Sequence, residues 1–473
     1  MITRRRFLTT GATLAGSAVA LAKAQAAPSQ PMNIQRQRKP YHLSVADYAG
    51  LPPGQPGKDY NPVITPNNVS LPWKIVDGVK VYHLIAKEVD HEFAPGLRAK
   101  CWGYNGRVHG PTIEAVEGDR VRIYVTNKLP AGTSIHWHGI LLPNGMDGVG
   151  GLNQRVIRPG ETFKYEFTLV QHGTHMYHSH HDEMIQMGLG TMGMFIIHPR
   201  KPARPRPDRD FAFMLMEWRI DVGTSRPNPF EMTDFNIFTF NAKAFPGTEP
   251  MVAKMGDRVR IRLGNTAAMS HHPIHLHGYQ FPIIETDGGQ IPESAQQLET
   301  TVLTGIGQAR AIEFIANQPG DWAMHCHMTH HMMNQMGHNF LNMIGIRPGD
   351  LDQQVGSLIP GYMTMGATGM DDMGQMVQPG NMGNMSHMAG MGNMINTAGM
   401  GNMRHMAVPV PPNSIPMVGG QGPFDYITTG GLFTVLKVRE HLTSYEDPGW
   451  YDHPPDTVAS LASAEELQRD GIT

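Results

Sequence analysis

The sequence predicts an all-β protein built from two tandem Greek-key domains, each a β-barrel or β-sandwich, and three observations predict it. The segment Gly-Asp-Arg-Val-Arg-Ile occurs twice, at residues 118–123 and 256–261. A His-x-His-Gly motif follows each copy, with its first histidine 18 residues after that first glycine in one copy and 19 in the other. Short alternating segments separated by Gly and Pro turns fill both copies, and long helical periods are absent before the last residues. A repeat of this length is a whole domain.

Each copy is expected to contain half-buried strands, because apolar and polar residues alternate in short runs. In the first copy these runs are residues 121–125 and 163–167, and in the second they are 259–263 and 311–314. A further alternating run at 432–438 is expected to return and pack on the second domain.

The first residues have the pattern of an export signal. Arg4 and Arg5 precede Phe7-Leu8, an apolar stretch runs from Ala12 to Ala22, and small residues offer cleavage after Ala24 or Ala26. This is a signal peptide, too short for a spanning helix, and its twin arginine resembles a Tat signal. The mature protein is therefore expected to be soluble and periplasmic.

Composition sets further bounds. With 473 residues the chain is long enough for more than one domain, and its formal net charge of −3 gives no polyanion-binding signature. The two cysteines, Cys101 and Cys326, cannot form a disulfide framework if one of them binds metal. We expect Cys101 to be an inert buried thiol.

The expected organisation has six parts. They are a Tat-type signal peptide at 1–26, an extension at 27–70, a first domain at 71–200, a second domain at 201–350, a Met-rich flexible segment at 351–420, and a final strand and tail at 421–473.

Histidine pairs indicate metal binding. Four His-x-His pairs occur, at His136/His138, His178/His180, His275/His277 and His325/His327. Clusters of imidazole and thiolate with few carboxylates suit copper or zinc. Zinc is disfavoured because eight paired histidines exceed what one closed tetrahedral site can use.

The segment His325-Cys326-His327 supplies candidate ligands for two different metal sites. In an extended strand successive side chains point to opposite faces, so the two histidines face one metal site and Cys326 faces another. A thiolate, imidazoles and a weak axial thioether form a blue-copper site, for which we expect Cys326, His331, Met336 and His272. The first copy has Ser179 in place of the cysteine and should lack such a site.

These motifs resemble those of the multicopper oxidases, the laccase-like proteins with cupredoxin-like domains, over roughly residues 75 to 346. The resemblance implies four coppers per functional unit and the coupling of four one-electron oxidations to the reduction of O2 to two waters. It places the type 1 copper on His272, Cys326, His331 and Met336, and the type 2 copper on His136 and His275. It places the type 3 pair on His138, His178, His180, His277, His325 and His327.

Only 92 residues separate His180 from His272, which resembles the two-domain branch with type 1 copper in the second domain. In that branch the trinuclear sites form between protomers of a homotrimer, which is our hypothesis here. Oxygen reduction also needs protons, and Asp147 lies where the family has an acidic residue near type 2 copper. Asp182 or Glu183 could take that role instead.

The donor is suggested by a Met-rich segment. Thirteen methionines fall within residues 363–406, and thioethers select Cu(I). We therefore expect Cu(I) oxidation in periplasmic copper tolerance. The alternatives are a laccase that oxidises small phenols, a linker role for the methionines, and a non-catalytic copper store or carrier. Copper nitrite reduction is disfavoured because those enzymes have type 1 copper in the first domain, where this chain has Ser179.

Overall fold

The structure is a computed structural model that describes residues 45–221, 223–335, 358, 413–415, 417, 419–424 and 426–472. All of these lie within residues 41–473, which form one compact unit. The predicted signal peptide, Met336 and nearly all of the Met-rich segment lie outside the described residues. Among the described residues, 42% are in strands and 7% in helices, which confirms the all-β prediction. Among the described residues, no helix has the length and apolar character needed to cross a membrane.

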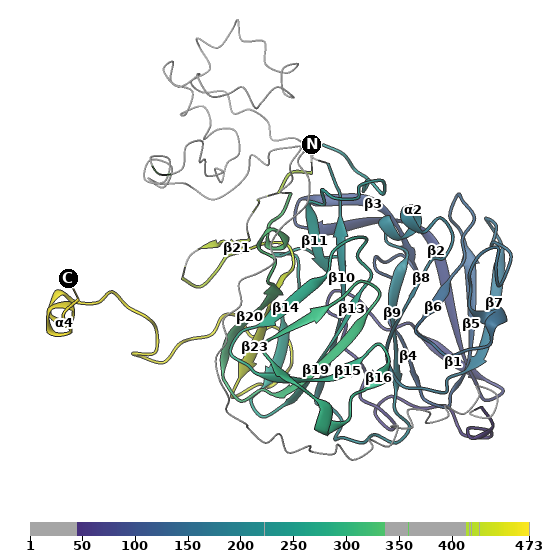
Figure 1. Cartoon of the computed structure of the whole chain (residues 1–473), viewed down its shortest axis with the longest axis horizontal. Helices are drawn as coiled ribbons and strands as arrows, with labels where there is room; N and C mark the ends of the chain where they lie inside the picture. Colours follow the sequence, from purple (N-terminus) through teal and green to yellow (C-terminus); the bar gives the residue numbers. More distant parts are fainter. Residues whose placement is uncertain are drawn as a thin grey trace, which may run out of the picture. The chain divides into compact units, whose positions relative to one another are not determined.

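The first group of strands forms two sheets around one hydrophobic core, coloured purple to blue in Figure 1. One sheet has the order β1-β2-β5-β7, with β3 also pairing β2, and the other has the order β4-β9-β8-β6. Their bounds are β1 Trp73–Val76, β2 Val79–Ala94, β3 Leu97–Tyr104, β4 Ile113–Val116, β5 Arg120–Asn127, β6 His136–His138, β7 Thr162–Thr168, β8 Gly173–His178 and β9 Met192–His198. The short helices η1 (Asn144–Met146) and α2 (Glu183–Gly188) lie in its connections.

The second group repeats this plan in teal and green, with β23 drawn in yellow (Figure 1). One sheet has the order β11-β10-β13-β19-β15-β16, with β17 also pairing β15, and the other has the order β12-β23-β20-β14-β18. Their bounds are β10 Arg209–Trp218, β11 Ile237–Phe240, β12 Met251–Lys254, β13 Arg258–Asn265, β14 His272–Leu276, β15 Phe281–Thr286, β16 Gly289–Gln290, β17 Leu298–Glu299, β18 Thr301–Thr304, β19 Ala309–Ile315, β20 Gly320–Cys326 and β23 Phe433–Arg439. The remaining elements are η2 Glu293–Ala295, η3 Thr329–Met332, β21 Gly420–Gln421, β22 Tyr426–Ile427 and α4 Ala464–Arg469.

The five strands expected from alternation are present. The runs at 121–125, 163–167, 259–263 and 311–314 lie within β5, β7, β13 and β19. The run at 432–438 gives β23, which pairs antiparallel with β20 and parallel with β12. The corresponding strand of the first group, β9, pairs antiparallel with β8 and parallel with β4. The second sheet is therefore completed by a strand that lies beyond the Met-rich segment.

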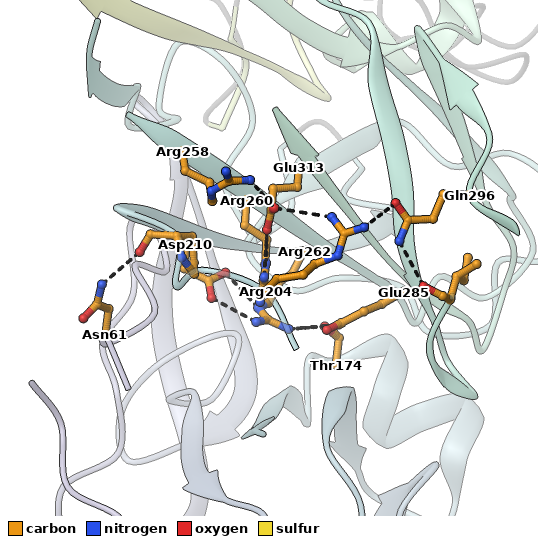
Figure 2. Close-up of polar contacts among 12 residues, drawn as sticks. Asn61, Thr174, Arg204, Asp210, Arg258, Arg260, Arg262, Glu285, Gln296 and Glu313 are labelled. Carbon is orange, nitrogen blue, oxygen red and sulfur yellow. Dashed lines mark hydrogen bonds and ion pairs between the residues drawn. The ribbon is translucent and has the colours of Figure 1, made fainter. Parts of the chain in front are cut away.

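Two kinds of contact join the groups. Buried methionines from both sides share one core, namely Met176, Met192 and Met194 on β8 and β9 with Met214 and Met216 on β10. Beside this apolar layer is the polar network of Figure 2.

Arg262 on β13 lies at the centre of this network. Its Nε and Nη2 donate to the two carboxylate oxygens of Asp210 at 2.8 and 2.9 Å. Its Nη1 donates to Thr174 Oγ1 on β8 at 2.8 Å and to Glu285 Oε2 at 3.0 Å. Thr174 belongs to the strand that ends at His178, so the network fixes this strand against the second group.

The segment before β1 follows the surface of both groups. The backbone N–H of Gly54 donates to Asp119, and that of Val63 donates to Glu114. Ile64 forms a parallel bridge with Phe211 of β10. The part of the extension from residue 45 onwards is thus held by buried carboxylates of the first group.

Candidate metal centre

The first histidine cluster is built by two paired strands. His136 on β6 lies opposite His178 on β8, so their side chains share one face of the sheet. One ring nitrogen each from His136, His138 and His178 lies within 4.8 Å of the others, a spacing that suits a shared metal site. His180 adjoins them, with its ring centre 5.4 Å from that of His136.

Hydrogen bonds set which nitrogen of each ring is free. The Nδ1 atoms of His136 and His178 donate to the carbonyl oxygens of Asp147 and Ser179 at 2.8 and 2.9 Å. Their Nε2 atoms are left for a metal ion, because a ligating histidine usually donates its other N–H to an oxygen. His138 is reversed, since its Nε2 donates to the carbonyl oxygen of Gly307 at 2.8 Å and its Nδ1 faces His178.

Gly307 belongs to the loop between β18 and β19, so the second group of strands orients a histidine of the first. Nothing in the sequence around Gly307 indicates this contact, and no prediction named it.

The second cluster is the equivalent set on β14 and β20. His275 lies opposite His325, and the Nε2 atoms of His277 and His325 are 3.1 Å apart. His275 Nδ1 donates to the carbonyl oxygen of Thr300 at 2.8 Å, and His325 Nδ1 donates to that of Cys326 at 3.0 Å. Their Nε2 atoms are therefore directed to the cluster.

His327 completes this second cluster, with its ring centre 5.7 Å from those of His275 and His325. His277 and His327 are exposed to solvent in the single chain. Within the part of the chain that the structure describes, no hydrogen bond or ring contact joins a histidine of the second cluster to one of the first.

Cys326 faces the other side of its strand, as alternation predicts. Its Sγ lies 3.7 Å from His272 Nδ1 and 3.5 Å from His331 Nδ1, and the two Nδ1 atoms are 3.2 Å apart. All three side chains are buried, and His331 stacks on Phe238 with ring centres 4.0 Å apart. Two imidazoles and one sulfur converging in an apolar surrounding suit a soft or borderline metal such as copper. The expected fourth ligand, Met336, lies outside the described residues.

Burial shifts the pKa values of these candidate metal ligands. It lowers the pKa of His178 and His272 to about 3 and that of His331 to about 4, so these imidazoles are neutral at physiological pH. It raises the pKa of the Cys326 thiol to about 12. Cation binding at this sulfur would therefore release its proton.

The first copy replaces this sulfur site with hydroxyls. Ser179 Oγ donates to Gln186 Oε1 at 2.6 Å, and Thr133 Oγ1 donates to the same oxygen at 2.7 Å. Thr133 precedes His136 by three residues, as His272 precedes His275. The first copy thus has a buried hydrogen-bond network at the place where the second copy has sulfur and imidazole.

The candidate carboxylates differ in position. Asp147 Oδ1 lies 3.4 Å from His136 Nδ1, and Glu183 Oε1 lies 2.7 Å from His180 Nδ1. Asp182 has a left-handed backbone conformation before α2 and lies 4.0 Å from His181. Asp147 and Glu183 therefore contact the first cluster directly, whereas Asp182 approaches His181, a histidine outside it.

The second cysteine, Cys101, has a buried thiol, which makes it unreactive. Cys101 is buried and forms no disulfide, and burial raises the pKa of its thiol far above the usual value. This agrees with the expectation that it has no chemical role.

Comparison with known proteins identifies the family. Residues 86–202 and residues 221–345 match two family models, each described as multicopper oxidase. Copper resistance protein A of Pseudomonas syringae pv. tomato is 28% identical over 241 residues, covering 41% of this chain and 39% of that protein. Laccase-1 of Botryotinia fuckeliana is 34% identical over 240 residues, covering 47% and 41%.

The alignments thus span about two fifths of the length of these curated relatives. Among solved structures, the blue copper oxidase from Nitrosomonas europaea is 30% identical with a TM-score of 0.49, covering 54% of this chain and 82% of that one. With a multicopper oxidase domain matched in each half of its repeat, the chain belongs to the multicopper oxidase family.

Proposed function

We propose that this chain is an exported periplasmic oxidase that couples one-electron oxidation of Cu(I) to the four-electron reduction of O2 in copper tolerance. The balanced reaction takes four Cu(I), one O2 and four protons to four Cu(II) and two waters. One observation carries the proposal. Cys326 lies with His272 and His331 on one face of β20, while its neighbours His325 and His327 belong to the histidine cluster on the other face.

The residues fit the four coppers that the family implies. The buried set of His272, Cys326 and His331, with Met336 as the expected axial ligand, would hold the type 1 copper. His136 and His275 would hold the type 2 copper, and the other six paired histidines would hold the type 3 pair. When bound, these ions supply the storage and transfer of single electrons.

The chain itself connects the two proposed metal sites and orients the side chains that would bind the metal. Cys326 is covalently joined to both His325 and His327, and its carbonyl oxygen accepts the hydrogen bond from His325 Nδ1. One residue therefore links the two faces. Carbonyl oxygens hold most of the ring nitrogens that point away from the clusters, which keeps the ligand atoms directed inwards.

Asp147 is the carboxylate that we assign to proton supply, because it contacts His136. Replacing Asp147 by Asn should slow reoxidation by O2 and leave reduction of the type 1 copper unchanged. Stopped-flow absorption measures the two half-reactions separately, and equal slowing of both would contradict this role.

A complete trinuclear site needs a second copy of the chain. The two clusters do not contact each other within the described residues, and the second cluster leaves His277 and His327 exposed. We therefore propose a homotrimer in which the first cluster of one protomer meets the second cluster of the next. Elution of a copper-loaded, active form as a monomer at low concentration would refute it.

The composition of the Met-rich segment favours Cu(I) as the donor, because thioethers select Cu(I). Apart from residue 358, the described chain stops at Gln335 and resumes at Asn413. Gln335 Nε2 donates to the carbonyl oxygen of Asn413 at 2.6 Å, and the N–H of Leu432 donates to that of His331 at 3.0 Å. The described residues on the two sides of the Met-rich segment are therefore in contact, at a point four residues along the chain from His331 of the proposed type 1 site.

Oxygen uptake by copper-loaded protein tests this function. Rapid uptake with Cu(I) that falls when residues 360–406 are removed would support a cuprous oxidase. Equal rates without the segment, with a simple phenol as the better donor, would make the protein a laccase and the methionines a linker. A blue colour that does not return in air after reduction would instead indicate a copper carrier.

A further inference from the structure

Residues 452–472, here called the arm, are exposed along their whole length. The chain before them is held to the second group of strands, for example by the N–H of Tyr451, which donates to Asp321 at 2.8 Å. After that point the only contact recorded between the arm and a more distant part of the chain, among the described residues, is the ring contact of His453 with Phe424.

The arm has local order and apolar side chains without cover. Ser463 caps α4 in a capping box with Glu466, so this turn of helix is specified by its own sequence. A six-residue helix is marginal by itself in water and normally depends on packing. Yet Leu461 is 98% exposed and Ile472 62%, which leaves its apolar residues available for a partner.

A matching surface lies on the first group of strands. A groove of about 1210 Å³, counting the space open to solvent, runs over β1, β2 and β5. Its apolar wall includes Trp73, Val81 and Tyr124, and its charged side chains are Lys74 and Arg122. No carboxylate lines it.

We propose that the arm of one chain binds in this groove on a second copy of the chain. The arm contains five carboxylates and a single arginine, Arg469. No carboxylate lines the groove, and although Arg122 is paired with Glu166 beside it, Lys74 is exposed at its edge. The leucines, valine and isoleucine of the arm match the aromatic and aliphatic floor of the groove. Apolar burial with opposite charges at the edge is the usual composition of a stable interface.

This inference rests on the arm and the groove and needs no copper chemistry, although it supplies a contact for the proposed trimer. Carbodiimide cross-linking tests it directly, because the reagent joins a lysine amine to a carboxylate that it touches. In the full-length protein we expect Lys74 to be joined to arm carboxylates. Lys87 is the matched control, since it is exposed on the same face of β2 at about 20 Å from Val81, the partner of Lys74.

Two co-expressed chains then separate contacts between copies from contacts within one. The first chain ends at residue 453 and keeps Lys74, and the second has the arm but carries Lys74→Arg, which preserves charge and cannot be cross-linked. A link between Lys74 of the first chain and the arm of the second is expected. Links in the full-length protein that disappear in this pair would overturn the assignment to a second copy.

The absence of any Lys74 link in the full-length protein would overturn the groove as the docking site. A substitution then tests the apolar contact. Because Leu461 is 98% exposed in its own chain, Leu461→Ser should leave the melting temperature of the chain unchanged and lower the link yield about tenfold. Leu298→Ser, at a residue 70% exposed elsewhere, should change neither. An unchanged yield with Leu461→Ser would contradict the proposal.

Discussion

Replacing Arg262 by Met tests how the two groups of strands are held together. Arg262 is 1% exposed, and its partners Asp210 and Glu285 are 2% and 6% exposed. Met has a similar length, so the substitution removes the charge and four hydrogen bonds without opening a large cavity. Two buried carboxylates then lose their partner, and breaking a buried pair in this way costs about 3–5 kcal/mol.

The unfolding free energy lost on replacing Arg262 should depend on pH and should be smaller in acid. Burial opposes ionisation of Glu285, but Arg262 beside it holds the pKa of this carboxyl below its usual 4.5. The stabilisation is therefore present above about pH 4.5 and is lost as the pH falls through the lower folded pKa. The difference in unfolding free energy between the native chain and the variant should shrink in acid.

Urea unfolding followed by tryptophan fluorescence at several pH values measures this difference. Arg310→Met is the control, because its pair with Asp287 is partly exposed and should cost at most about 1 kcal/mol. Adding Asp210→Asn and Glu285→Gln to the Arg262 variant should recover much of the loss, since no charge is then left buried. A loss below that of the control would refute the reasoning.

Three further predictions concern individual side chains. Cys326→Ser should abolish the blue absorption and remove about one copper per chain in metal analysis, because serine supplies no thiolate; retained blue colour would exclude Cys326 as the ligand. Glu183→Gln should weaken copper retention or reoxidation about 10–100-fold through His180, measured by dialysis against a chelator and by O2 uptake, whereas Asp182→Asn should behave like the native chain. His109 is buried with both ring nitrogens unpartnered, and burial lowers its pKa to about 3. The folded chain therefore loses stability as the pH falls from 6.5, by about 2 kcal/mol at pH 5, and His109→Phe should remove this loss in acid unfolding curves.

Much of the candidate site can be read from local pattern. The residue types that suit copper are visible directly in the sequence, and the alternation of a strand places His325 and His327 opposite Cys326 without knowledge of the fold. The duplicated segment predicts two domains, and the replacement of cysteine by Ser179 predicts a sulfur site in the second copy alone. These conclusions depend on neighbours along the chain, where geometry is set by the backbone itself.

Only the tertiary structure decided which distant residues meet. The register of β6 with β8 places His136 opposite His178, and the loop at Gly307 determines which nitrogen of His138 is free. The return of β23 beside β20, the separation of the two histidine clusters and the burial of Arg262 between the two groups have no local signature. Such contacts depend on how sheets pack and pair between residues far apart in the chain, from 42 residues for His136 and His178 to 169 for His138 and Gly307. The sequence by itself determined the chemistry that those contacts bring together.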